Sequence, residues 1–111
     1  MTDSVDLTDL RSITEGDKEI EQALFDEFYS STEAHLQILA ANCTDGQNET
    51  WRSTAHAMKG TAFNIGALML GELCKKAQDE EDVSGEEKKQ QLDLMQKEYV
   101  KVKAYLTSLF L

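Results

Sequence analysis

The chain has 111 residues, enough for one domain with its own hydrophobic core. Its 11 basic and 21 acidic residues give a net charge of −10, which opposes a general affinity for nucleic acid or anionic membranes, since both attract basic surfaces. The sequence contains no proline and only 6 glycines, and strong helix formers fill the stretches between short polar clusters. We therefore predict an all-α fold and a single domain over residues 1–111.

Five stretches show the periodicity of helices that turn one apolar face toward a core. Within each stretch, apolar residues recur at spacings of three and four, and polar or glycine-containing clusters separate the stretches. The predicted helices span roughly residues 5–14, 17–42, 48–65, 67–81 and 86–109.

The first predicted helix is short, and the second is long. Leu7, Leu10 and Ile13 form the apolar side of the first helix, which we expect to act as a lid on a larger core. Asp17 follows a glycine and can cap the second helix. The predicted apolar stripe of the second helix consists of Ile20, Leu24, Phe28, Ser31, His35, Ile38 and Leu39, widened by Phe25, Tyr29, Thr32 and Leu36.

The third and fourth predicted helices follow a polar loop. Asn48 can cap the third helix, and Gly66-Ala67 can break the chain before the fourth. The apolar positions of the third helix lie opposite His56, so we expect this histidine to face solvent. The predicted core positions are Trp51, Ala55, Met58, Ala62 and Ile65 in the third helix and Leu70, Leu73, Cys74 and Ala77 in the fourth.

The fifth predicted helix begins with a capping box. Ser84 and Glu87 have the spacing at which each side chain satisfies a free amide near the other residue. The seam that follows is shorter than four heptads, so we expect it to pack inside a bundle rather than to form a dimeric coiled coil, and we expect a monomer. The seam residues are Leu92, Met95, Tyr99, Val102, Leu106 and Leu109.

The remaining compositional signals point to a cytosolic protein. Cys43 and Cys74 have no Cys-x-x-Cys spacing, and we expect both to be reduced, buried hydrophobic residues. No basic and then apolar leader precedes residue 20, and no apolar run approaches the roughly 20 residues that a membrane span needs. The end of the chain at a complete fifth helix favours a freestanding protein.

One face of the third helix combines groups suited to phosphoryl chemistry. His56, Lys59 and Gly60 stand at positions i, i+3 and i+4, so an imidazole, an ammonium group and bare backbone share that face. A neutral imidazole keeps one lone pair for attack on phosphorus, and the lysine can stabilise the charge of the phosphoryl oxygens. Arg52 and Phe63 lie on the same face, at the edge of a possible docking surface.

Gly60 is unusual because glycine inside a helix costs about 0.5–1 kcal/mol relative to alanine. The absence of a side chain there would let a phosphoryl group or another protein approach the backbone. From helical position alone, however, the same residues also fit a surface histidine, a solvated lysine and a glycine needed for helix packing. The spacing leaves both interpretations open.

A longer run closely resembles the signature of histidine-containing phosphotransfer domains. The family pattern is His-x-Leu-Lys-Gly-Ser-(Ala/Ser)-x-Asn-(Leu/Ile)-Gly-Ala, and Met58 and Thr61 here replace the leucine and the serine. The run after it, residues 67–74, also resembles the next helix of the family, and the likeness extends from about residue 7 to 109. The matching run is His56-Ala57-Met58-Lys59-Gly60-Thr61-Ala62-Phe63-Asn64-Ile65-Gly66-Ala67.

The resemblance implies a four-helix up-and-down bundle with an additional N-terminal helix. It also implies that His56 is phosphorylated on Nε2, in a protein that passes phosphoryl groups between receiver aspartates or takes them from a sensor kinase. Lys59 matches the lysine beside the phosphate, Gly60 matches the small residue that keeps the histidine accessible, and Arg52, Phe63 and Asn64 would contact the partner. No cofactor is expected in this chain, because Mg²⁺ would belong to the receiver domain.

Three other functions fit less well. A sensor-kinase dimerisation domain would have an acidic residue after the histidine and a nearby proline, and no glycine-rich nucleotide loop supports autonomous kinase activity. A metal-binding bundle would need Glu-x-x-His pairs, but Thr32 precedes His35 and Ser53 precedes His56 at this spacing. The remaining alternative is a non-catalytic adaptor that binds a response regulator without exchanging phosphate.

Three more residues stay open from sequence alone. His35 lies in the apolar stripe of the second helix, where a partly buried histidine with satisfied hydrogen bonds is the expected state. Lys75 and Lys76 are paired cations on the fourth helix, and we expect a solvated face there, although one of them could face the site.

Overall fold

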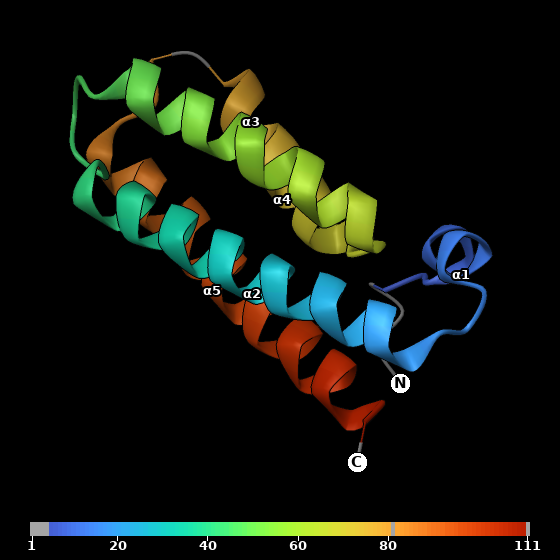
Figure 1. The fold of residues 1–111 in the computed structure, drawn as a ribbon. Helices are drawn as coiled ribbons and strands as arrows, with labels where there is room; N and C mark the ends of the chain where they lie inside the picture. Colours follow the sequence, from blue (N-terminus) through green and yellow to red (C-terminus); the bar gives the residue numbers. More distant parts are fainter. Residues whose placement is uncertain (1–4, 81, 111) are drawn as a thin grey trace.

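The computed structural model describes residues 5–80 and 82–110, and this part of the chain forms five helices (Figure 1). The helices are α1 (Thr8–Thr14), α2 (Lys18–Ala41), α3 (Asn48–Ile65), α4 (Leu68–Asp79) and α5 (Gly85–Ser108). Helices α2 to α5 form a closed bundle in which α3 packs on α2 and α4, and α5 packs on α4 and α2. The predicted all-α fold is therefore confirmed. No helix in the described ranges is long and apolar enough to cross a membrane.

Local hydrogen bonds set the helix boundaries, and two of the predicted caps are found. Asp17 accepts from the backbone amides of Glu19 and Ile20, at 3.0 and 3.1 Å. Ser84 accepts from the amide of Glu87 at 3.1 Å, and the Glu87 carboxylate in turn accepts from the Ser84 hydroxyl. These bonds begin the two longest helices.

Other predicted boundaries were wrong. The N-cap of α3 is Gln47, which makes no side-chain cap bond, and Asn48 is already helical. Helix α1 begins three residues later than predicted, because Val5 forms an antiparallel bridge with Ala67 instead of joining the helix. Helix α4 ends at Asp79, and the predicted end at Glu81 lies outside the described residues.

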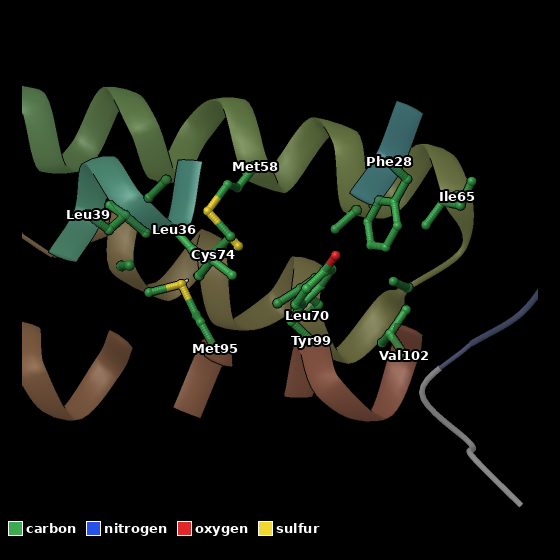
Figure 2. Close-up of a cluster of buried hydrophobic side chains, with 14 of the residues drawn as sticks. Phe28, Leu36, Leu39, Met58, Ile65, Leu70, Cys74, Met95, Tyr99 and Val102 are labelled. Atoms are coloured by element: carbon green, nitrogen blue, oxygen red, sulfur yellow. Dashed lines mark hydrogen bonds between the residues drawn. The ribbon is translucent and has the colours of Figure 1, made fainter. Parts of the chain in front are cut away.

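The core runs along the bundle axis and joins α2, α3, α4 and α5 (Figure 2). All five predicted core positions of α3 are buried, as are Leu70, Cys74 and Ala77 in α4 and all of the α5 seam up to Leu106. Burial raises the pKa of the Cys74 thiol to about 12, which fits a reduced, inert cysteine. Cys43, by contrast, is only half-buried.

The predicted stripe of α2 was displaced around the helix. Ile20, Leu24 and Ile38 are exposed, whereas Phe28 and Leu39 of the predicted stripe are buried together with Phe25, Thr32 and Leu36, which were expected only to widen it. The reason is that α2 packs between α3 and α5, so its buried face points between these two neighbours. The fully or nearly fully buried residues of α2 are Glu21, Phe25, Phe28, Thr32, Leu36 and Leu39.

Helix α1 stands at one end of the bundle (Figure 1), and Leu7 and Leu10 belong to the buried core cluster, so this segment covers the core at that end. Leu7 and Leu10 are buried, but Ile13 is 79% exposed. The segment before α1 crosses the α3–α4 turn, where the amide of Asp6 donates to the carbonyl of Gly66 at 2.8 Å. Gly66 has φ +88°, and a Cβ there would lie 1.9 Å from the carbonyl oxygen of Asp6. Both its backbone conformation and this contact require glycine.

A polar cluster links α2 to α5 on the outer side of the bundle. The Glu33 carboxylate accepts hydrogen bonds from Lys103 Nζ at 2.7 Å and from the hydroxyl of Tyr99. The Lys103 ammonium and the Tyr99 hydroxyl hold the pKa of Glu33 below its ordinary value of 4.5. Burial, together with the Glu33 carboxylate, raises the pKa of Tyr99. These contacts join α2 to α5 and include no residue of α3.

Candidate functional site

His56 is exposed in the middle of α3, on the side of the helix away from its buried stripe. Its Nδ1 lies 3.1 Å from Oε1 of Gln78 on α4. Because an amide oxygen can only accept, this contact assigns the proton of a neutral ring to Nδ1. The lone pair is then on Nε2, the ring nitrogen that Gln78 does not engage. The arrangement holds the imidazole in one tautomer and leaves a nucleophilic nitrogen free.

The backbone of Gln78 is held in place by α3 as well. Arg52 Nε donates to the Gln78 carbonyl oxygen at 2.9 Å, one helical turn before His56. Arg52 thereby satisfies a carbonyl at the C-terminal end of α4, where backbone acceptors have no partner within the helix. The residue that orients His56 is thus fixed by a second contact from the same helix face.

Lys59 and Gly60 lie one turn after His56, as the sequence predicted. Lys59 is half-buried and makes no ion pair within the part of the chain that the structure describes. Gly60 is exposed, and a Cβ added to it would meet nothing within 4 Å. Packing inside this chain therefore does not require glycine at position 60. A bare strip of helix is left beside the imidazole.

Phe63, which the helical position placed at the edge of a possible docking surface, is half-buried rather than fully exposed. Its ring packs on Gly71 of α4, where an added Cβ would lie 2.4 Å from the ring. Gly71 is thus the glycine that the α3–α4 packing requires. Phe63 fixes the spacing of these two helices on the His56 side, and part of its ring remains available at the surface.

A groove of about 450 Å³ opens next to the bare strip, between α1, α2 and α3. Thr61 and Asn64 of α3 form one wall, so the face that carries His56 and Gly60 continues directly into the groove. Most of the remaining lining is apolar, and Glu27 is its charged residue. The α1 and α2 walls are Leu10, Ile13, Leu24, Glu27, Phe28 and Ser31.

A buried carboxylate holds the α1 wall in place. Glu21 of α2 is fully buried, and its Oε2 accepts from the hydroxyl of Thr14 at 3.0 Å and lies 3.5 Å from Arg11 Nε. Lys18 Nζ lies 3.9 Å from the other carboxylate oxygen. A buried charge without such partners would be strongly destabilising. Thr14 and Arg11 belong to α1, so these contacts fix α1 against the start of α2.

Comparison with known protein families identifies the kind of domain that carries this site. A family model described as the Hpt domain matches residues 23–109, which is most of the chain. The chain belongs to the Hpt domain family. Members of this family act in histidine phosphotransfer within phosphorelays, where they interact with receiver domains and kinases. Searches of curated proteins and of solved structures find no match.

Gln78 is the residue of this Hpt domain that sequence reasoning missed. Its contact with His56 spans 22 positions and depends on how α3 and α4 are aligned. The only signal in the sequence that could have pointed to Gln78 was its position as a polar residue near the end of α4, beside the apolar face of that helix. The groove was missed as well, because Ile13 and Leu24 were assigned to the core rather than to an open surface.

His35, Lys75 and Lys76 lie outside the contacts described so far. His35 of the Hpt domain is half-buried, and its Nδ1 has no hydrogen-bond partner among the described residues, so the expected satisfied state is not found. Both lysines are exposed on α4. Within the described ranges, no group of three or more His, Cys, Asp or Glu side chains could hold a metal ion.

Proposed function

We propose that His56 is the phosphoryl acceptor of a phosphorelay intermediate. On this proposal, His56 takes the phosphoryl group from a phospho-aspartyl receiver domain or a sensor kinase and passes it to another receiver aspartate. The contact between His56 Nδ1 and Gln78 Oε1 carries the proposal, because it directs the lone pair to the exposed nitrogen. Family membership supports the same role in general terms.

The transfer needs no general base in this chain. Nε2 attacks phosphorus in line with the aspartyl oxygen, a P–N bond forms, the P–O bond breaks, and the aspartate leaves as a carboxylate. The ring becomes a phosphorylated imidazolium whose Nδ1 proton stays hydrogen-bonded to Gln78. The positive charge that develops on the ring strengthens this bond, so the contact stabilises the product more than the free histidine. The reverse transfer follows the same path.

Lys59 and Gly60 have distinct roles in this proposal. Lys59, which has no ion-pair partner in the described residues, supplies positive charge to the equatorial phosphoryl oxygens. Gly60 lets the partner approach the helix backbone closely enough for its aspartate to reach His56. No cofactor of this chain enters the step, and Mg²⁺ would be bound by the receiver.

The partner would cover the bare strip and continue into the groove. Asn64 forms part of the groove wall, whereas Arg52 and Phe63 lie on the α4 side of the strip, where the edge of the partner would contact them. An apolar helix of a receiver domain, with a basic residue opposite Glu27, would complement the lining. We further propose that the protein acts as a monomer, since all residues of the proposed site come from one copy. We also propose that it acts in the cytosol.

The test is phosphorylation by a phosphorylated receiver domain. The wild-type chain should gain an acid-labile phosphate, and His56→Gln should lose it while its circular dichroism spectrum and melting temperature stay close to those of the wild type. The matched control is His35→Gln, which replaces the other histidine and should keep the phosphate. Phosphate uptake by His56→Gln would contradict the site. A wild-type chain that binds a receiver but never accepts phosphate would support the adaptor function instead.

A further inference from the structure

Three contacts define the register in which α3 and α4 pass each other. Phe63 of α3 packs on Gly71, whereas His56 and Arg52 both contact Gln78, so the two helices run in opposite directions along this seam. Gly71 and Gln78 are seven residues apart, which is close to two helical turns. Any residue between them on the same face of α4 must therefore lie beside the stretch from His56 to Phe63.

Lys75 is that residue. It follows Gly71 by four positions and precedes Gln78 by three, so at about 100° per residue it lies within roughly 60° of both. The buried side of α4, with Leu70, Cys74 and Ala77, lies on the other flank of Gly71 and Gln78. Lys75 thus projects on the solvent side of the seam, opposite Lys59 and Gly60. It is exposed, as a residue in this place must be.

Lys76 differs from Lys75 in the direction in which its side chain leaves α4. It follows Lys75 directly on α4 and is also exposed. The step of about 100° places it roughly 140–160° around the helix from Gly71 and Gln78. Lys76 therefore points away from His56, and the two lysines form a matched pair of one near and one distant cation.

The charges around the seam leave a place for an anion. In the described ranges, Arg11, Lys18, Lys97 and Lys103 form ion pairs, and the other seven basic residues, Lys59 and Lys75 among them, form none. The acidic residues on these two helices are Glu49 of α3 and Glu72 and Asp79 of α4. Glu72 and Asp79 stand three residues before and four residues after Lys75 and form no ion pair with it, so the ammonium groups of Lys59 and Lys75 are both available to an anion over the seam.

We propose that Lys75 is a second phosphoryl-binding residue, which contacts the oxygens of the phosphoryl group on His56 from the α4 side while Lys59 contacts them from α3. The inference rests on His56 being the acceptor. In the phosphorylated state the dianionic phosphoryl group is bonded to Nε2, and the ammonium group of Lys75 offsets its negative charge. The positive charge of Lys75 stabilises the phosphorylated histidine. It therefore slows hydrolysis of the phosphoryl group and favours phosphorylation of His56.

The test uses phosphoramidate, a small phosphoryl donor that brings no protein surface. The variants are Lys75→Gln and Lys76→Gln, which remove the same charge from neighbouring positions. Lys75→Gln should lower the phosphorylation rate of His56 and shorten the half-life of the phosphohistidine by roughly two- to fivefold, the range for one solvent-exposed charge pair. Lys76→Gln should match the wild type within error. Lys75→Arg should restore most of the loss, and added salt should reduce the difference.

Each other outcome separates the proposal from its alternatives. Equal rates and half-lives for Lys75→Gln and Lys76→Gln would overturn it. If these stay equal with phosphoramidate but Lys75→Gln slows transfer from a phosphorylated receiver, Lys75 contacts the partner and not the phosphoryl group, which also overturns it. If the wild-type chain accepts phosphate from neither donor, the acceptor assignment of His56 fails first, and the result is distinguishable from a failure at Lys75.

Discussion

Gln78 Oε1 lies 3.1 Å from Nδ1 of His56, and the two residues come from different helices. With the amide oxygen of Gln78 facing the ring, this contact favours the tautomer that carries its proton on Nδ1 and restrains rotation of the ring. The nucleophilic nitrogen is set by packing between α3 and α4 rather than by a charged neighbour. The reactivity of His56 should consequently follow the integrity of this contact.

Replacing Gln78 with leucine should slow phosphorylation of His56 by phosphoramidate by roughly two- to twelvefold, the equivalent of one hydrogen bond of about 0.5–1.5 kcal/mol. The reason is that the ring can then rotate and populate the other tautomer. Nitrogen-15 NMR of the imidazole should show this change directly. Gln96→Leu, at an exposed position of α5, is the control and should leave both rate and tautomer unchanged. An unchanged tautomer in Gln78→Leu would contradict the role of Gln78.

Replacing Gly60 with leucine should block transfer from a receiver while the bundle stays folded. The site has room for a side chain, and leucine has the higher helix propensity, so the free energy of unfolding should stay level or rise by up to about 1 kcal/mol. Receiver-dependent transfer should fall at least roughly tenfold, because the added side chain occupies the surface that a partner must cover. Gly60→Ala should have a smaller effect on transfer. Full transfer by Gly60→Leu would show that no partner approaches this strip.

Replacing Ile13 with aspartate should weaken receiver docking without changing the chemistry at His56. Ile13 is 79% exposed and lines the groove, so the chain should tolerate the change. Loss of its burial against a partner should raise the apparent KM for the receiver by roughly tenfold or more, with little change in kcat or in labelling by phosphoramidate. Val100→Asp is the control, because Val100 is 66% exposed on α5, which does not line the groove. Equal behaviour of the two variants would exclude the groove as a docking surface.

Replacing Gly66 with alanine should destabilise the protein by about 1–3 kcal/mol, measured by urea unfolding. The new side chain meets both a φ of +88° and the carbonyl of Asp6. Gly46→Ala separates the two effects, since Gly46 has φ +87° but open space around it. Gly66→Ala should therefore cost more than Gly46→Ala and should also shift the NMR signals of α1. Equal costs would mean that the contact with Asp6 contributes nothing.

Acidification should weaken the link between α2 and α5 through Glu33. Because the folded state lowers the pKa of this carboxyl, the stabilisation is fully present above the ordinary value of 4.5 and is lost as the pH falls through the lower folded value. Glu33→Gln should flatten this part of the curve of unfolding free energy against pH. Glu27→Gln is a control on the same helix and should leave the curve nearly unchanged. If the unfolding free energy of Glu33→Gln fell with decreasing pH in parallel with that of the wild type, Glu33 would not account for the loss of stability at low pH.

Periodicity predicted the helices and most of their inner faces, because α3 and α5 each pack on neighbours that meet one well-defined stripe. Trp51, Met58, Met95 and Val102 are buried as predicted. The same method placed Ile20 and Ile38 of α2 inside, although both are exposed. Hydrophobicity alone does not show which flank of a wide stripe meets another helix, and that depends on where the neighbours lie.

The candidate site was predictable only where its residues share one helix. His56, Lys59 and Gly60 follow one another on α3, so a helical wheel brings them together. Gln78 and the groove depend on the register of α3 against α4 and on the placement of α1, which no local pattern contains. Two glycines with similar local sequence signals also proved different, since Gly71 is packed under Phe63 and Gly60 is open.

The contacts of Glu21 with Thr14 and Arg11 have a consequence for how the choice of partner can evolve in such a protein. His56, the proposed acceptor, and the residues that contact it lie on α3 and α4, whereas Leu10 and Ile13 of the groove belong to a separate short helix that Glu21 links to α2. If receivers dock on this groove as proposed, mutations in α1 alter which receivers bind while Nε2 of His56 and its surroundings stay constant. Phosphorelays that share the same chemistry would then become separated from one another through changes in α1, a helix of seven residues.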